Sequence, residues 1–579
     1  MARSRAKERP PAKHANNLSN VIPPRAAPAD VSAWRDRALV AAVAVGASLA
    51  GIANDFVFDD VPQVVENIRI HDLSHIGEIL TSAYWPPPYA PELFRPVASI
   101  SVALQYLMGG GGPTIFRVVS YLLYALAAVG VYSLAARLLP RRIALGIGVL
   151  FAAHPVHVEA VALAVNQGEL IVGWAATAAT IRYLDRRRGG GLTAGDWGML
   201  CVLFALAALS KENGFVVPAL LVAVECFVVG ENTGLPERVR AVWRGYAALT
   251  VVGVALLVAR AAVLSGNVAG ALPAKAIAGL SLGGRLLTML QLVPKWLRLL
   301  AWPAHLQIDY SPNEIVASTH LGAQELLGLA LLIAFAVIAW LARRRAPVIT
   351  FGLTWCAIAL FPVSNIVPTG IVVAERTLFL PSIGFLIAVG GAVDLLLKRY
   401  AAIERPLAAA CGILAITGVA RSDLRHRTWR NGQTMWQAAE VDAPRSLRVK
   451  QAHEEAVADL ARDFERAIAA SPAPWRVEFE LATLLRYMRA DSAALEHLRK
   501  SVAAQPNQTD ATLELSATLI STGHYVEAKE IASRVSASDN AARAAQVLTA
   551  LADSASRTNA PAGSVRVIAR ELLPSNSRP

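Results

Sequence analysis

The chain has 579 residues, of which 55% are hydrophobic and 17% are charged, and its formal net charge is +12 at pH 7. Soluble domains carry about 25% charged residues, so this composition excludes a wholly soluble protein. It does not indicate a nucleic-acid partner either, because the basic residues gather in short connections between apolar runs, as the positive-inside rule describes. These basic clusters are Arg141-Arg142, Arg186-Arg187-Arg188, Arg343-Arg344-Arg345 and Lys398-Arg399.

A basic tail at residues 1–37 precedes the first apolar run. A secretory signal peptide has a shorter charged region and an A-x-A-like cleavage site, so we expect the run that starts at Ala38 to be a retained signal anchor. The tail then stays in the cytoplasm, and its polar composition predicts disorder. Its basic residues are Arg3, Arg5, Lys7, Arg9 and Lys13.

Apolar stretches follow one another from residue 38 to residue 420. Eleven of them are candidate membrane spans, each of which needs about 20 mostly apolar residues. With the tail inside, the basic clusters fall on the cytoplasmic side, whereas the loops 55–113, 265–321 and 364–377 and everything after 421 fall outside. The predicted spans are 38–55, 114–136, 142–158, 167–185, 196–210, 213–229, 245–264, 322–342, 347–363, 378–397 and 405–420.

One apolar segment, 285–302, does not fit this count because it carries three basic residues among its leucines and tryptophans. Counting it as a span would place the basic cluster at Arg343 outside. We therefore expect an amphipathic helix that lies at the outer interface, with Trp296 and Trp302 at headgroup depth.

Charged residues return to ordinary density after Arg421, and the sequence then repeats with a period of 34 residues. Leu481 recurs at Leu515 and Ala494 at Ala528, which is the spacing of tetratricopeptide helix–turn–helix units. This predicts a short, soluble α-solenoid with a concave surface for a protein or peptide; an inert helical cap is the alternative. The predicted boundaries are a linker at 421–451, the repeat domain at 452–555 and a disordered tail at 556–579.

The outer loop 55–113 carries two adjacent carboxylates, Asp59 and Asp60. Adjacent carboxylates beside a bilayer repel one another and lose solvation unless a cation or a proton relieves them. Such a pair suits a general base for an acceptor hydroxyl, or a ligand set for a divalent cation on a phosphate. A solvated loop pair is the alternative.

Further polar residues are predicted at the same membrane face, near the ends of several spans. An ion in lipid costs about 2.5–3.5 kcal/mol on insertion scales, so residues of this kind usually line a cavity. Their convergence predicts a site, with buried salt bridges as the alternative for the Lys211–Glu212 and Glu375–Arg376 neighbours. The candidate residues are Arg95, His154, His157, Glu159, Lys211, Glu212, Glu375 and Arg376.

A set of motifs stands in a fixed order along the chain: Phe58-Asp59-Asp60 with Asn67, Arg95-Pro96, His154-Pro155-Val156-His157-Val158-Glu159, Leu209-Ser210-Lys211-Glu212, Trp302-Pro303 with Asp309-Tyr310-Ser311, and Ala374-Glu375-Arg376-Thr377. This set resembles the TMTC-type proteins, which are transmembrane and tetratricopeptide-repeat O-mannosyltransferases of the GT-C superfamily. The resemblance covers about 55–540 and includes the repeats. It is specific as a set, since no single motif carries it.

The resemblance implies an all-α fold, with a GT-C-like helical bundle over 38–420. It also implies an inverting transferase that takes a sugar, mannose or another hexose, from a polyprenyl-phosphate donor at the outer face. By that carry-over Asp59 is the expected base or metal ligand and Asp60 its helper, with Mg²⁺ or Mn²⁺ as the candidate cofactor. The remaining candidates would bind substrate, and a protein hydroxyl held by the repeats, or another envelope acceptor, would receive the sugar.

Two departures from the family pattern are present. Gln167-Gly168-Glu169 stands where the family places an arginine shortly before an acidic residue, and the repeat array is shorter than in eukaryotic members. The first bears on recognition of the donor phosphate and the second on the acceptor. The expected location is a bacterial inner membrane, or the endoplasmic-reticulum membrane of a eukaryote, with the outer loop on the periplasmic or lumenal side.

The alternative from another class is a non-catalytic membrane scaffold whose repeats bind an envelope-assembly partner. The carboxylates, histidines and arginines near the bilayer disfavour a scaffold, because a scaffold does not need charged residues there. A transporter ranks third, since its ionisable residues would lie at the bilayer midplane.

Overall fold

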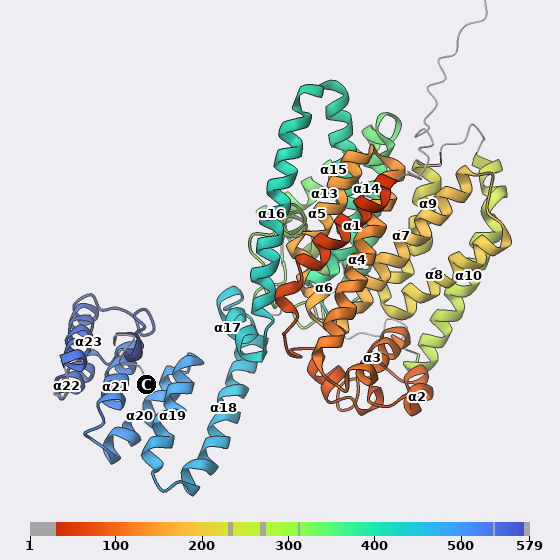
Figure 1. Ribbon diagram of the computed structural model, residues 1–579. Helices are drawn as coiled ribbons and strands as arrows, with labels where there is room; N and C mark the ends of the chain where they lie inside the picture. Colours follow the sequence, from red (N-terminus) through yellow and green to blue (C-terminus); the bar gives the residue numbers. More distant parts are fainter. Residues whose placement is uncertain (1–30, 230–234, 267–273, 311–312, 536–538, 573–579) are drawn as a thin grey trace, which may run out of the picture. The chain divides into compact units, whose positions relative to one another are not determined.

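The computed structural model describes residues 31–229, 235–266, 274–310, 313–535 and 539–572 (Figure 1). Over these ranges the chain forms helices and loops without a β-strand, so the predicted all-α fold is confirmed. It divides into two compact units, a membrane unit at Met1–Ser446 and a repeat unit at Leu447–Pro579. The tail's basic residues, Arg3 to Lys13, and Ser311 lie outside the described residues.

Helices α1 to α17 build the membrane unit, and each of the eleven predicted spans contains at least part of one of them. Their bounds are α1 Val31–Gly46, α2 Ile76–Thr81, α3 Pro96–Gly109, α4 Pro113–Leu138, α5 Arg141–Ala152, α6 Val158–Ala162, α7 Gln167–Arg188, α8 Ala194–Ser210, α9 Val217–Phe227, α10 Leu235–Val263, α11 Leu282–Leu290, α12 Val293–Ala301, α13 Ala323–Arg345, α14 Pro347–Leu360, α15 Phe379–Arg399, α16 Glu404–Thr428 and α17 Gly432–Asp442.

Within the described ranges, five helices are long and apolar enough to cross a membrane, which identifies a multi-pass membrane protein. The helix pair Arg141–Ala152 and Pro155–Ala162 passes the same test together, bent by 45°. The bend falls at Pro155, which has no backbone N–H with which to continue the α5 hydrogen-bond ladder. The count of eleven spans remains a prediction. The five helices are Pro113–Leu138, Pro236–Val263, Ala323–Arg345, Glu375–Arg399 and Ala401–Thr428.

The core of the membrane unit includes α4, α5, α7, α14 and α15, with Phe151, Trp355 and Phe379 fully buried in it. Helices α14 and α15 approach closely because a glycine from each lies at their contact. A Cβ atom on Gly384 would stand 2.5 Å from the Gly352 carbonyl oxygen. Small residues permit such contacts between membrane helices. This packing fixes the start of α15 at Phe379, which follows the turn that holds the candidate site residue Arg376.

The segment 285–302 forms two short helices, α11 and α12, and neither is long enough to span a membrane. Trp302 is exposed, as an interfacial tryptophan would be. Trp296 differs from the prediction, because it is buried among Met289, Leu299 and other apolar residues. The inner face of α12 therefore belongs to the core of the membrane unit.

The predicted linker at 421–451 is wrong, because α16 continues through it to Thr428 and α17 follows at once. Arg425 and Trp429 are almost fully buried in the membrane unit. The Arg425 guanidinium pairs with Asp442 at 3.0 Å and with Glu375 at 3.6 Å. These contacts tie the segment to the membrane unit, so the boundary falls after Ser446.

The repeat unit consists of helix pairs with the tetratricopeptide spacing, as predicted. Helices α20 and α22 begin at Asp491 and Tyr525 and so keep the 34-residue period. Leu481, Leu498 and Leu515 are buried between the helices. The helix bounds are α18 Leu447–Ala470, α19 Pro474–Tyr487, α20 Asp491–Ala504, α21 Thr509–Ser521, α22 Tyr525–Ser533 and α23 Asp539–Arg557.

The predicted disordered tail after residue 556 is wrong for residues 558–572, which fold back onto the repeats. Gly563 N–H donates to the Ser521 carbonyl at 2.8 Å, and Ala569 is buried. The buried Arg486 guanidinium of α19 donates to the Val567 carbonyl. The composition of the segment did not predict this folding, because main-chain groups hold the segment in place. The Val567 carbonyl, for example, accepts a hydrogen bond from the buried Arg486.

Candidate functional site

Most of the predicted site residues gather in one group at one end of the membrane helices, which we call the charged cluster. Burial lowers the pKa of the Lys211 ammonium, and the nearby positive charges of Arg95 and Arg376 lower it further, while Glu169 raises it. These charges therefore act on one another directly. The charged cluster consists of Asp59, Arg95, Glu159, Glu169, Lys211, Glu212 and Arg376.

Arg376 joins two carboxylates from distant parts of the chain. It lies in the 3-10 turn Glu375–Leu378, just before α15. Its backbone N–H donates to Glu159 Oε2 at 2.8 Å, and its guanidinium contacts Glu159 Oε1. A second nitrogen, Nη2, lies 3.9 Å from Asp59 Oδ2. Glu159 thus orients the guanidinium and leaves part of it turned toward Asp59.

Asp59 keeps an open side. Its side chain is 26% exposed, and the long contact to Arg376 is its only ion pair among the described residues. No protein donor in those ranges gives its carboxylate a hydrogen bond. A carboxylate that is partly exposed and not engaged can accept a proton from a bound hydroxyl.

Asp60, its neighbour, points inward and is fully buried. The N–H groups of Ala164 and Val165 each donate to its carboxylate at 3.0 Å, and Arg117 lies 3.5 Å away. Burial raises the pKa of Asp60, and Arg117 only partly opposes that rise. The Asp60 carboxylate therefore anchors its loop to the turn Ala164–Asn166.

The acidic pair does not fit a shared divalent cation. Asp60 is fully buried, and each of its oxygens accepts a hydrogen bond from the backbone, so the protein already satisfies this carboxylate without a metal. Nor do the described parts of the chain contain a group of three or more His, Cys, Asp or Glu side chains that could hold a metal ion.

Lys211 is held by Glu169 at the start of α7. Its ammonium lies 3.0 Å from Glu169 Oε1, and the Asn213 amide donates to Glu169 Oε2. Gly168 makes this contact possible, since a Cβ atom there would stand 2.7 Å from the Ser210 carbonyl oxygen. The Gln167-Gly168-Glu169 motif thus brings α7 against the end of α8.

Gln167 does not reach the charged cluster. Its side-chain amide exchanges two hydrogen bonds of 2.8 Å with the Gln105 amide and donates to Ser120 as well. All of these groups are buried. The position at which the family has an arginine therefore holds a neutral, internally satisfied pair in this chain.

Arg95 forms a bidentate pair with Glu212, with its closest approach at 2.6 Å, and its guanidinium lies over the Tyr84 ring. Arg260 of α10 adds a second cation at 3.2 Å from Glu212. Burial raises the pKa of the Glu212 carboxyl, but these two guanidinium groups outweigh burial and hold the pKa at about 2. Glu212 is thus a fixed anion that orients Arg95.

The two candidate histidines lie outside the charged cluster. His157 is buried, and its ring nitrogens contact Ser382 Oγ at 2.9 Å and Tyr124 Oη at 3.0 Å. His154 Nε2 lies 3.0 Å from the Leu300 carbonyl oxygen. Both rings contact neighbouring helices at the break between α5 and α6.

Glu375 also turns away from the charged cluster, although it precedes Arg376. Its Oε1 accepts hydrogen bonds from Gln307 N–H at 2.5 Å and Tyr310 Oη at 2.9 Å, and its Oε2 faces Arg425. It is fully buried. We call this group, with Gln307, Tyr310 and Arg425, the Glu375 network.

Sequence reasoning missed four residues in and around the site: Tyr84, Arg117 and Arg260 contact candidate site residues, and Gln105 pairs with Gln167 outside the charged cluster. Each reaches its partner across more than 45 positions of the chain or through a loop, and none belongs to a recognisable motif. Arginines inside apolar runs were the only available signal, because an ion in a span normally needs a partner.

The chain matches two family models. Residues 91–260 match the family described as dolichyl-phosphate-mannose-protein mannosyltransferase, and residues 492–551 match a tetratricopeptide-repeat family. The first match contains Arg95, Glu159, Glu169, Lys211 and Glu212, and the second lies within the repeat unit. None of the solved structures matches the chain significantly.

Curated relatives extend the match to both units. Protein O-mannosyl-transferase TMTC3 of Mus musculus is 23% identical over 448 residues, which are 71% of this chain and 48% of the relative. TMTC4 of Homo sapiens is 26% identical over 485 residues, 74% of this chain and 64% of the relative. Tmtc1 of Drosophila melanogaster is 32% identical over 182 residues, 30% of this chain and 20% of the relative.

The chain thus spans about half to two thirds of the length of the mouse and human relatives. The resemblance to the TMTC-type O-mannosyltransferases is confirmed, in its membrane unit and in its repeats.

Proposed function

We propose that this TMTC-like chain is a membrane glycosyltransferase that moves a hexose from a polyprenyl-phosphate donor to a protein hydroxyl. The carrying observation is the open carboxylate of Asp59 beside the oriented guanidinium of Arg376. A base next to a cation is what transfer from a sugar phosphate to a hydroxyl requires. Mannose is the proposed sugar, because the relatives are named O-mannosyl-transferases.

The reaction needs one proton acceptor and one charge acceptor. Asp59 takes the proton of the acceptor hydroxyl as its oxygen forms a bond to the anomeric carbon. The bond from that carbon to the donor phosphate oxygen breaks, and the polyprenyl phosphate leaves with the electron pair. Attack opposite the leaving group inverts the anomeric configuration.

The leaving phosphate is stabilised by cations that the fold holds in place. Arg376 is fixed by Glu159, Arg95 by Glu212 and Lys211 by Glu169, so none of them must reorganise when charge develops. Each cation is only partly exposed, which strengthens its field. No metal is needed in this scheme.

The charged cluster is proposed to face the periplasm or the lumen of the endoplasmic reticulum. Helices α7 and α15 begin beside the cluster and end in basic residues, Arg186-Arg187-Arg188 and Lys398-Arg399. The positive-inside rule places those ends in the cytoplasm. Reporters that are active only outside should light up when fused at about residue 75 or 440 and stay dark at 188 and 345. A bright fusion at 345 would contradict this orientation.

Sugar transfer by the purified full-length protein tests the proposed reaction. The protein is given a polyprenyl-phosphate hexose and serine- or threonine-containing peptides, and the products are read by mass spectrometry. We expect Asp59→Asn to lower the rate by about 10²–10⁴, the usual loss on removal of a general base. Asp55→Asn is the matched control, because Asp55 is an exposed carboxylate of the same loop.

Full activity of Asp59→Asn would remove this carboxylate from the chemistry. No transfer by the unaltered protein from any polyprenyl-phosphate hexose would favour a non-catalytic scaffold instead.

The repeat unit is proposed to hold the protein acceptor. Its helices carry the tetratricopeptide pattern, and such repeats commonly form binding surfaces for peptides. Deletion of Leu447–Pro579 should then lower transfer to protein while a polyprenyl-phosphate analogue still binds. Loss of analogue binding would show that the donor site depends on the repeats, and unchanged protein transfer would leave them with another role.

A further inference from the structure

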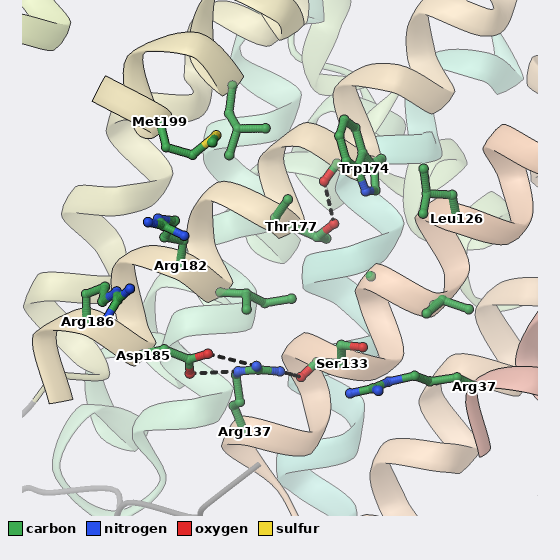
Figure 2. A pocket seen from close by; sticks show the side chains of 15 residues that line it. Arg37, Leu126, Ser133, Arg137, Trp174, Thr177, Arg182, Asp185, Arg186 and Met199 are labelled. Atoms are coloured by element: carbon green, nitrogen blue, oxygen red, sulfur yellow. Dashed lines mark hydrogen bonds and ion pairs between the residues drawn. The ribbon is translucent and has the colours of Figure 1, made fainter. Parts of the chain in front are cut away.

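A furrow of about 700 Å³ runs between α4, α7 and α8, at the basic ends of α4 and α7 (Figure 2). Its walls are mostly apolar, with Leu126, Trp174, Ile181 and Met199 among them. The size lies within the range of pockets that hold small amphiphilic ligands. Where such a furrow opens to the hydrocarbon of a membrane, an apolar chain fills it most favourably.

Small residues let α4 and α7 approach closely where they line the furrow. A Cβ atom on Gly130 would stand 2.5 Å from Thr177 Oγ1, so the two helices touch along the furrow floor. The Thr177 hydroxyl already donates within α7, to the carbonyls of Gly173 and Trp174. The Thr177 hydroxyl on the floor is therefore already hydrogen-bonded and needs no polar group from a ligand, which suits a hydrocarbon chain.

The end of the furrow carries more positive than negative charge. Arg37, Arg137, Arg182 and Arg186 line it, with a single lining carboxylate, Asp185. Arg137 is paired with Asp185 at 2.7 Å. Figure 2 shows Arg37 reaching in beside Ser133 from another helix.

One further carboxylate, Asp196, pairs with two of the other three arginines, at 2.6 Å from Arg182 and 3.0 Å from Arg186. Four guanidinium groups thus share two carboxylates. Arg37 has no carboxylate partner in the described parts of the chain. Two positive charges are left at the mouth of an apolar furrow.

We propose that this furrow binds an anionic phospholipid of the surrounding leaflet, with an acyl chain along the apolar walls and the phosphate among the arginines. Basic pockets between membrane helices bind lipid phosphates in this way, and guanidinium groups suit phosphate oxygens geometrically. The site is separate from the charged cluster, because Glu169 and Arg186 lie about 26 Å apart along α7. The proposal does not depend on sugar transfer.

Two paired variants test the headgroup. Arg37→Gln with Arg182→Gln removes two charges, while Asp185 keeps Arg137 and Asp196 keeps Arg186. Arg344→Gln with Arg345→Gln removes two exposed arginines at the end of α13 and is the matched control. Delipidated protein is titrated with phosphatidylglycerol, phosphatidylcholine or inorganic phosphate, and binding is followed by native mass spectrometry.

The expected result is tighter binding of phosphatidylglycerol than of phosphatidylcholine by the unaltered protein and by the control. The Arg37 and Arg182 variant should lose about 25-fold in that affinity, a factor of about five for each arginine. Equal loss in both variants, or equal binding of the two lipids, would overturn the proposal.

A third variant, Ala178→Phe, tests the acyl chain by filling the furrow without changing its charge. It should bind phosphatidylglycerol more weakly than the unaltered protein does, and it decides the question if the arginine variant fails to fold. Unchanged lipid binding by Ala178→Phe would overturn the acyl-chain placement. Inorganic phosphate that competes as well as phosphatidylglycerol would show a free-anion site instead.

Discussion

The charged cluster and the Glu375 network adjoin one another in the chain and differ in access to solvent. In the cluster Asp59 is 26% exposed and Arg376 retains a partly open edge. In the network Glu375 and Arg425 are at most 1% exposed; protein donors occupy Glu375 Oε1, and Oε2 faces Arg425. Adjacent charged residues therefore differ in access: the charged cluster is partly exposed, whereas the Glu375 network is buried and holds segments together. Asp60 with Arg117 belongs to the second kind.

The largest effect that separates the two regions is expected for Asp60→Asn. This substitution leaves Arg117 buried without its anion, and breaking a buried pair costs about 3–5 kcal/mol. We expect a lower thermal midpoint and a lower yield of monodisperse protein than for Asp59→Asn. Asp55→Asn again provides the exposed control. If Asp60→Asn has normal stability but no transfer activity, Asp60 takes part in the reaction itself.

The next effect is expected for Arg376→Lys, which keeps the charge and loses the planar fork. An ammonium cannot serve Glu159 and a phosphate in the geometry that the guanidinium holds. The transfer rate should fall by about 10²-fold, comparable with the loss of one oriented donor in other transferring sites. The exposed Arg427→Lys should leave the rate unchanged. An undiminished rate in Arg376→Lys would show that charge alone is enough.

A smaller effect is expected in the repeat unit, from Arg566→Ala. Arg566 donates to the Arg486 carbonyl and lies 3.3 Å from Asp491, so it fastens the returning segment 558–572 to α19. Its loss should cost about 0.5–1.5 kcal/mol, the usual net contribution of a hydrogen bond, because Arg566 itself is exposed. Hydrogen exchange should then rise in α21, and the exposed Arg557→Ala should not change it. Unaltered exchange would mean that the segment is held by its other contacts.

The smallest effect is expected from a chelator. Because backbone donors already engage both Asp60 oxygens, EDTA should change the transfer rate by less than about twofold. The measurement is the initial rate before and after dialysis against EDTA. Loss of activity that Mg²⁺ or Mn²⁺ restores would contradict the metal-free scheme.

Much of the candidate site could be predicted from the sequence, because charged residues in apolar surroundings are costly and stand out. Arg95, Glu159, Lys211, Glu212 and Arg376 come together as expected. Their catalytic and binding roles remain proposals. His154, His157 and Glu375 make their hydrogen bonds with residues outside the charged cluster, since neighbours in a turn point in different directions.

The sequence by itself determined the all-α fold, the apolar helices and the 34-residue repeat. These follow from local properties, namely hydropathy over about 20 residues and the spacing of small and large residues. Only the tertiary structure decided that Asp59 stays open while Asp60 is sealed, and that residues 421–446 and 558–572 pack onto their units. These features depend on partners that lie far away in the sequence, such as Arg117 for Asp60 and Arg425 for Glu375. The residue pattern of one segment carries no information about such distant partners.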